Sequence, residues 1–218
     1  MMASDSDLFL FFEERKNEVE EYFLFLDKLN IDNESSFVLT LNGSGDFQLS
    51  DSQIKIFKGN CFMMLYNLIE GVVSKSLQYI FDTINDKGIE YRLLITELIR
   101  VWLKYPDRHK STDELFNLDL EKFSKENQGY FYSGNIDAKL IRETLTKKIG
   151  FDFDKQEAKL RDIKEYRNAI AHGEKSFSEI AQDKTLSKLT EYKHSTFEYL
   201  QEFISCVEEY ISDEKYLT

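Results

Sequence analysis

Residues 51–85 constrain the fold most strongly, because apolar side chains recur along them at three- and four-residue steps with no proline between them. This spacing predicts one long helix. Its apolar residues are Phe57, Phe62, Leu65, Leu68, Ile69, Val72, Leu77, Ile80 and Phe81. The stripe they form is wider than a surface helix needs, so we expect this helix to lie at the centre of an all-α fold.

Similar periodicity predicts further helices on both sides of the central one. They span 5–30, 89–105, 136–149, 154–172 and 177–214, the last as one long helix or a broken pair. Pro106, Gly150 and Gly173 mark expected helix ends. The polar residues 107–134 predict an irregular segment, with a turn or two of helix around 112–125. These segments together predict an up-and-down helical bundle.

Residues 31–50 have a different pattern from the rest of the chain. In the string SFVLTLNGSGDFQLS, β-branched and apolar residues lie on either side of the turn-forming residues 42–46. Two such runs around an Asn-Gly turn are typical of a β-hairpin. We expect a short hairpin-like insertion after the first helix.

The composition indicates a single domain over residues 1–218, because one proline and nine glycines leave no flexible linker. Cys61 and Cys206 lie in apolar helical contexts, which is typical of reduced thiols in a cytoplasmic protein. The apolar run at 8–12 is too short for a signal sequence or a membrane span. The net charge of −12 argues against non-specific binding of nucleic acid.

No metal or cofactor site is predicted. His109 and His194 have no second His or Cys at the spacing of metal ligands. The glycines at 43–45 lack the lysine and the strand–helix context of a phosphate-binding loop. The paired glutamates of this acidic chain are best interpreted as solvated helix faces.

The segment 165–177, EYRNAIAHGEKSF, carries the best candidate for chemistry. Arg167 and His172 are five residues apart, which places them about 140° apart around a helix axis. In one interpretation Arg167 pairs with a carboxylate and His172 caps the helix end, where a cation is favoured. In the other, the arginine binds a phosphate, Asn168 adds a polar group, and the histidine transfers protons near neutral pH.

Arginine, histidine and an amide are sufficient to cleave RNA without a metal. A base removes the proton of the ribose 2′-OH, which attacks its own phosphate, while a cation stabilises the transition state and an acid protonates the leaving 5′-oxygen. One histidine cannot easily perform both proton transfers. A two-fold dimer would bring two copies of the motif into one cleft and remove this difficulty.

These residues resemble the signature of the HEPN superfamily, the higher eukaryotes and prokaryotes nucleotide-binding domain. The string RNAIAHGEKSF is similar to the RN-x-LAHG-x-x-SF form of one bacterial branch. YNLIEG at 66–71, SGNIDAKLIRE at 133–143 and the tyrosine-rich last helix are similar to other segments of that branch. The resemblance implies an all-α bundle and a metal-independent endoribonuclease of toxin–antitoxin, abortive-infection or other phage-defence systems.

The resemblance also implies roles for individual residues. Arg167 and His172 would be catalytic, with Asn168 as their polar neighbour. Asn67 and Glu70 are weaker candidates that could orient the arginine, although an ordinary ion pair explains Glu70 equally well. Some members carry a tyrosine two residues after the histidine that a partner nucleotidyltransferase modifies. Glu174 stands at that position, so this modification is not expected here.

Ser176 is either a phosphate contact or the N-cap of the last helix, and the cap is the better interpretation. Cations gather just before and within the motif helix, and we expect this stretch to line the RNA cleft, with Lys164 and Arg161 binding RNA. The stretch consists of Lys139, Arg142, Lys147, Lys148, Lys159, Arg161, Lys164 and Arg167.

The expected partners are RNA, a second copy of the chain, and an antitoxin or another protein of a defence system. Two alternatives remain open at this point. One is a catalytically silent module that binds a nucleotide, RNA or protein. The other is an acidic antitoxin or immunity factor.

Overall fold

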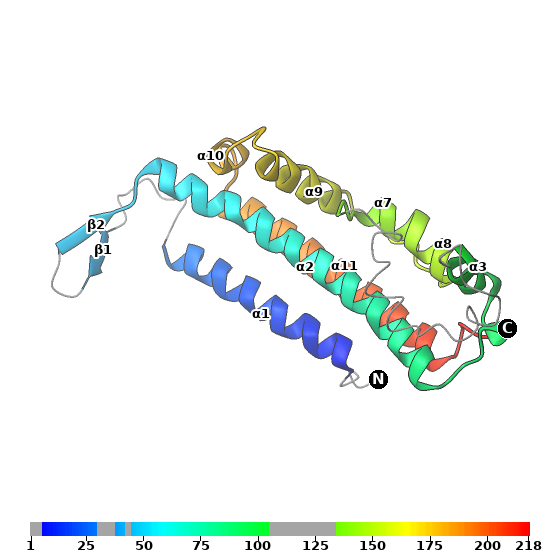
Figure 1. Cartoon of the computed structure of the whole chain (residues 1–218). Coiled ribbons are helices and arrows are strands. Elements are labelled where there is room, and N and C mark those ends of the chain that lie inside the picture. The colour runs from blue at the N-terminus through cyan, green and yellow to red at the C-terminus, as the bar shows by residue number, and fades with distance from the viewer. Residues whose placement is uncertain (1–5, 30–37, 42–44, 105–133) are drawn as a thin grey trace, which may run out of the picture. The chain divides into compact units, whose positions relative to one another are not determined.

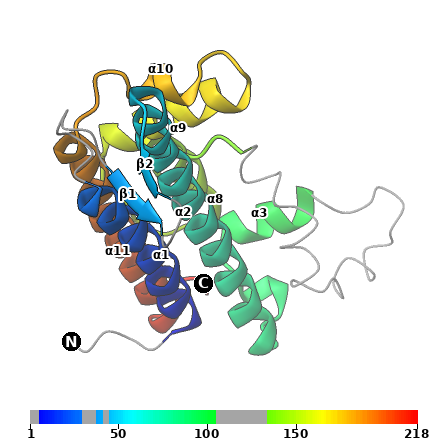
Figure 2. The same cartoon turned by 90° about the vertical axis from the view of Figure 1, so that its left-hand side faces the viewer.

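The computed structural model describes residues 6–29, 38–41, 45–104 and 134–218, whose regular elements are helices apart from one small sheet (Figures 1 and 2). The prediction of an all-α fold is therefore confirmed. The long helices are α1 (Asp7–Lys28), α2 (Asp51–Asp86), α9 (Ala158–Ala171) and α11 (Leu186–Ser212). The shorter elements are a 3-10 helix (Tyr91–Leu93), α3 (Thr96–Lys104), α7 (Ala138–Leu140), a π-helix (Ile141–Leu145), α8 (Thr146–Ile149) and α10 (Phe177–Ala181).

The hairpin predicted after the first helix is present. Strands β1 (Val38–Leu41) and β2 (Gly45–Gln48) pair antiparallel, with Val38 opposite Gln48 and Leu41 opposite Gly45. The middle of the turn, 42–44, lies outside the described residues, and so does the irregular segment predicted at 107–134, apart from its last residue. This two-stranded sheet lies between α1 and α2 in the chain.

The helix predicted at 89–105 begins later than expected. Residues before α3 pair instead with the C-terminal residues of the chain. The Ile95 N–H donates to the Tyr216 carbonyl at 2.9 Å, and the Thr218 N–H donates to the Leu93 carbonyl at 2.9 Å. Because these backbone groups are committed to an antiparallel bridge, the α-helix starts only at Thr96.

The helix predicted at 154–172 also begins later than expected, at Ala158. Phe151 and Phe153 are buried, whereas Asp152 and Asp154 between and after them are exposed. This alternation has a period of two, which an extended segment satisfies and a helix does not. The Phe153 ring packs 5.2 Å from the Tyr199 ring, and this contact holds the segment extended.

The other helix predictions hold with one interruption. The segment predicted at 136–149 is helical from Ala138 but contains the π-helix at 141–145, and it ends at Gly150, whose φ is +85°. A Cβ at Gly150 would lie 2.3 Å from Ile95 Cδ1, so both the backbone angle and the lack of space require glycine. The last segment is a broken pair, α10 and α11.

Contacts divide the chain into two compact units. Unit 1 consists of Met1–Phe11, Ile69–Glu157 and Tyr199–Thr218, and unit 2 consists of Phe12–Leu68 and Ala158–Glu198. Helices α1, α2 and α11 each contribute residues to both units. The single domain predicted over 1–218 stays a prediction. Within the described residues, no helix combines the length and the apolar character that a membrane span requires.

Candidate active site

The motif helix α9 ends in unit 2 with a glycine-dependent turn. Gly173 has a φ of +71°, the left-handed conformation in which glycine is favoured. Its N–H donates to the Ile170 carbonyl at 3.1 Å, and the Glu174 N–H donates to the Ala169 carbonyl at 2.9 Å. This pair of hydrogen bonds is the Schellman motif of helix C-termini. The prediction that Gly173 ends the helix is confirmed.

His172 is the last residue before this glycine, and the turn exposes it. The N–H of His172 donates to the Asn168 carbonyl at 2.9 Å, so its backbone completes the last helical turn. Its side chain is exposed. The histidine therefore has a fixed backbone and an imidazole that a substrate can reach.

Arg167 is held on two sides by residues of unit 2. Its guanidinium carbon lies 3.7 Å from the centre of the Tyr66 ring, over the face of a fully buried tyrosine. Its Nη1 donates to Asn168 Oδ1 at 2.9 Å. A cation over an aromatic face is attracted by the ring quadrupole, more strongly when it is desolvated. The two sequence-predicted residues Arg167 and Asn168 are thus in direct contact.

One stripe of α2 holds the motif segment in place, and α9 lies beside the first half of α2 in Figures 1 and 2. A Cβ at Gly59 would lie only 2.5 Å from the Phe177 carbonyl oxygen. The Phe62 ring lies 4.6 Å from the Tyr166 ring. Tyr66 then follows on the same face, because positions three, four and seven residues apart align along a helix. Unit 2 therefore fixes α9 and the residues after it against one face of α2.

Ser176 begins α10 as its N-cap. The Ser176 Oγ accepts the Glu179 N–H at 3.2 Å, and Glu179 Oε2 accepts the Ser176 N–H at 2.7 Å, which completes a capping box. Hydrogen bonds from the Ser176 backbone and side chain lower the pKa of the Glu179 carboxyl. The interpretation of Ser176 as a cap is confirmed, and its contact with phosphate stays a prediction.

The two weaker candidates lie on α2. Asn67 is exposed and directly follows Tyr66. Glu70 is half-buried and belongs to unit 1, whereas Arg167 belongs to unit 2. Their roles in orienting the arginine stay predictions. Tyr66, the residue beside Asn67, contacts the guanidinium of Arg167.

The basic stretch before the motif is divided between the units, and Lys139, Arg142 and Arg161 lie near carboxylates. Arg161 is exposed, and its nitrogens lie 3.9 Å from Asp162 Oδ1 and 3.9 Å from Glu165 Oε1. Exposed pairs at such distances contribute little, so a phosphate can replace them. Lys164 is half-buried on the same helix. Whether the stretch lines a cleft stays a prediction, because its cations up to Lys148 belong to unit 1.

A tyrosine cluster joins α9 to α11 beside the motif. The Tyr192 hydroxyl donates to Asp162 Oδ2 at 3.2 Å, and Lys184 Nζ donates to the Tyr166 hydroxyl at 3.3 Å. Burial, together with Tyr166 and Asp162, raises the pKa of Tyr192. The hydroxyl therefore stays protonated at neutral pH, and its role is to hold α9 in position.

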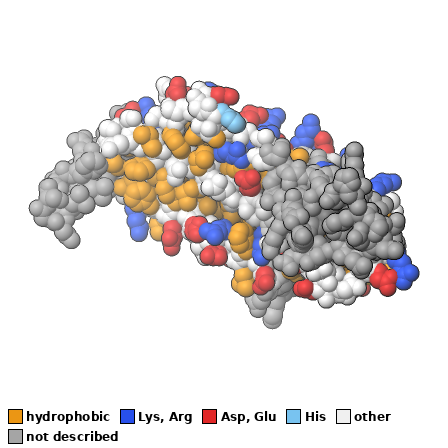
Figure 3. Space-filling view, viewed as in Figure 1, with side chains coloured by type: hydrophobic (Ala, Val, Ile, Leu, Met, Phe, Trp, Pro, Cys, Tyr) orange, Lys and Arg blue, Asp and Glu red, His pale blue; other side chains and the backbone are white. Residues whose placement is uncertain are grey.

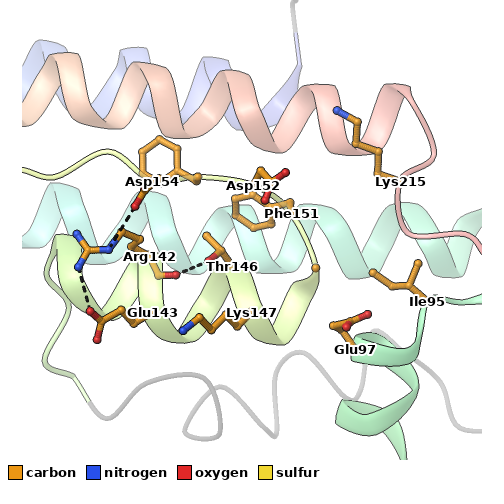
Figure 4. Close-up of a pocket in the computed structure, with 12 residues that line it drawn as sticks. Ile95, Glu97, Arg142, Glu143, Thr146, Lys147, Phe151, Asp152, Asp154 and Lys215 are labelled. Carbon is orange, nitrogen blue, oxygen red and sulfur yellow. Dashed lines mark hydrogen bonds and ion pairs between the residues drawn. The ribbon is translucent and has the colours of Figure 1, made fainter.

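A pocket of about 930 Å³ lies in unit 1 and contains none of the motif residues (Figure 4). Arg142, on the π-helix, pairs with Glu143 at 2.9 Å and with Asp154 at 3.5 Å in its wall. Across the described part of the chain, no group of three His, Cys, Asp or Glu side chains could hold a metal ion. His194 is exposed on α11, and His109 lies outside the described residues.

Three residues of this site have no role predicted from the sequence: Gly59, Tyr66 and Phe177. Tyr66 was visible as the first residue of YNLIEG, and its seven-residue separation from Gly59 is a helical spacing. That spacing shows that the two share a face of α2. It does not show which helix they face, because such contacts join residues far apart in the chain.

Comparison with protein families gives one match over nearly the whole chain. The family model described as MAE_28990-like HEPN matches residues 4–216. Searches of the curated proteins and of the solved structures gave no match.

Proposed function

This chain belongs to the MAE_28990-like HEPN family, and we propose that it is a metal-independent endoribonuclease. It would act in the cytoplasm as part of a bacterial toxin–antitoxin or phage-defence system. One observation carries the proposal: Arg167 is held against Tyr66 and Asn168, and an exposed His172 ends the same helix. A fixed cation and an accessible imidazole are the groups that this reaction uses.

The reaction follows from the chemistry of these groups. His172 acts as a base and takes the proton of the ribose 2′-OH, and the 2′-oxygen forms a bond to the adjacent phosphorus. The guanidinium of Arg167 stabilises the negative charge that develops on the phosphate oxygens. The bond from phosphorus to the 5′-oxygen breaks, and an acid protonates that oxygen. The products carry a 2′,3′-cyclic phosphate and a 5′-hydroxyl.

A second copy of the chain would complete the site, because one imidazole cannot easily act as both base and acid. An apolar face on unit 2 supports this part of the proposal. Ile56 is 44% exposed, Met63 is half-buried, and the two share a face of α2 with the exposed Asn67. Ile170 on α9 is half-buried as well. Figure 3 shows hydrophobic side chains gathered over the first part of α2.

The net charge of −12 favours a second candidate function slightly. A surface so acidic repels a polyanion, which suits a silent module that binds a nucleotide or a protein, or an acidic antitoxin or immunity factor. Neutralisation of a cognate toxin by the His172→Ala variant would support the antitoxin. Any RNA cleavage that depends on His172 excludes both alternatives.

The test uses total RNA in excess chelator with three proteins. Wild type is compared with His172→Ala and with His194→Ala, a matched control whose histidine is exposed on α11 of the same unit. We expect wild type and His194→Ala to cleave RNA and His172→Ala to lose cleavage. Cleavage that survives in His172→Ala, or absence of cleavage by the wild type, would overturn the proposal.

A further inference from the structure

We infer that Tyr66 is a positioning residue that sets the plane of the Arg167 guanidinium for contact with phosphate. The inference rests on the proposed function and adds to it a residue outside the motif. Tyr66 is fully buried, so it does not itself reach a substrate, and its ring meets the guanidinium at 3.7 Å. It acts on the reaction only through the arginine.

The contact geometry explains why a ring is needed here. A guanidinium that stacks on an aromatic face uses its flat side, and its N–H donors remain in the plane at its edge. The Asn168 side-chain oxygen takes one of these donors at 2.9 Å and so fixes the rotation of the group within that plane. The ring thus supports the plane of the guanidinium, and the amide contributes to its rotation within that plane. A phosphate that approaches the edge then meets a pre-oriented fork of donors.

The position of Tyr66 is itself well determined. Two contacts precede it on the same face of α2. Phe62 against Tyr166 sets the position of α9 along α2, and Gly59 against Phe177 sets that of α10. Any large apolar side chain would fill the space of the Tyr66 ring, whereas only an aromatic one offers a face. Tyr66→Leu therefore keeps most of the packing and removes the stacking on Arg167, whereas Tyr66→Phe keeps both.

The first measurement needs no activity. Aromatic ring current shifts the Arg167 side-chain proton resonances upfield, and NMR reads this shift in the wild type, Tyr66→Phe and Tyr66→Leu. The control is Tyr199→Leu, which removes another fully buried tyrosine, in unit 1. We expect the shift in the wild type, Tyr66→Phe and Tyr199→Leu, and its loss in Tyr66→Leu. An unshifted wild-type resonance overturns the inference, even if Tyr66→Leu fails to fold.

The second measurement is the rate of RNA cleavage at saturating RNA. We expect Tyr66→Phe to stay within about threefold of the wild type and Tyr66→Leu to lose roughly tenfold in rate, as removal of a partly desolvated cation–π contact predicts. If Tyr66→Leu cleaves RNA at the same rate as Tyr199→Leu, the inference is overturned and the endoribonuclease proposal stands. A wild type that cleaves no RNA overturns the proposed function, and the resonance shift then decides alone whether Tyr66 orients Arg167.

Discussion

Gly59 of α2 and Phe177 of α10 are so close that a Cβ at position 59 would lie 2.5 Å from the Phe177 carbonyl oxygen. Real Cβ atoms do not approach backbone oxygen at this distance, so one of the two segments must move if a side chain is added. Phe177 directly follows the loop that leaves the motif histidine. The contact therefore links the position of that loop to the packing of α2.

We expect Gly59→Ala to destabilise the protein by about 1–3 kcal/mol, because overpacking outweighs the better helix propensity of alanine. The matched control is Gly71→Ala on the same helix, where a Cβ would lie an ordinary 3.5 Å from the Phe11 ring. That variant should be neutral or more stable by up to about 1 kcal/mol. Urea unfolding measures both, and equal effects would contradict the packing argument.

Gly173→Ala tests the turn after His172 without any steric clash. The φ of Gly173 is +71°, and a Cβ there would meet nothing within 4 Å. The expected cost is therefore backbone strain alone, about 1–2 kcal/mol. Gly88→Ala is the control, because its φ is +61° and its surroundings are equally open. The two variants should lose similar stability in thermal unfolding, and only Gly173→Ala should lower RNA cleavage.

The stability of the fold should fall in alkaline solution because of Cys61. Burial raises the pKa of this thiol from 9.0 to about 12. A pKa raised in the folded state gives stability that is fully present below the unfolded pKa, near 9, and is lost as pH rises toward 12. The loss at pH 10.5 should be about 2 kcal/mol, at 1.36 kcal/mol for each unit. Cys61→Val should remove this part of the loss, as urea unfolding at pH 8 and 10.5 would show.

The apolar face of α2 should be needed for self-association. Ile56→Glu places a charge on that face, so we expect monomers in light scattering and at least a tenfold loss of cleavage, with an unchanged circular dichroism spectrum. Leu10→Glu is the control: Leu10 is 53% exposed on α1 and belongs to unit 1. A monomeric wild type, or an Ile56→Glu variant that remains dimeric and active, would contradict an active site formed by two copies of the chain.

The sequence predicted the features that depend on local patterns. The unbroken 3.6-residue periodicity predicts the central helix at 51–85, and the helix spans Asp51–Asp86. The end of α9 is also predicted from a local signal, because Gly173 marks it. The late start of α9 at Ala158 is not predicted: the sequence pattern places a helix from 154, although Phe151 and Phe153 alternate with aspartates just before it. The contact of Tyr66 with Arg167 could not be predicted, because it depends on how two distant helices pack.

The most direct test of the central claim is the chemistry of the RNA ends. Wild-type protein and His172→Ala are incubated with RNA in excess chelator, and mass spectrometry identifies the 3′ ends of the products. We predict 2′,3′-cyclic phosphate ends that are formed by the wild type and absent with His172→Ala. Products that end in a 3′-hydroxyl, or cyclic phosphate ends formed equally by both proteins, would contradict attack by the 2′-OH at a site built on Arg167 and His172.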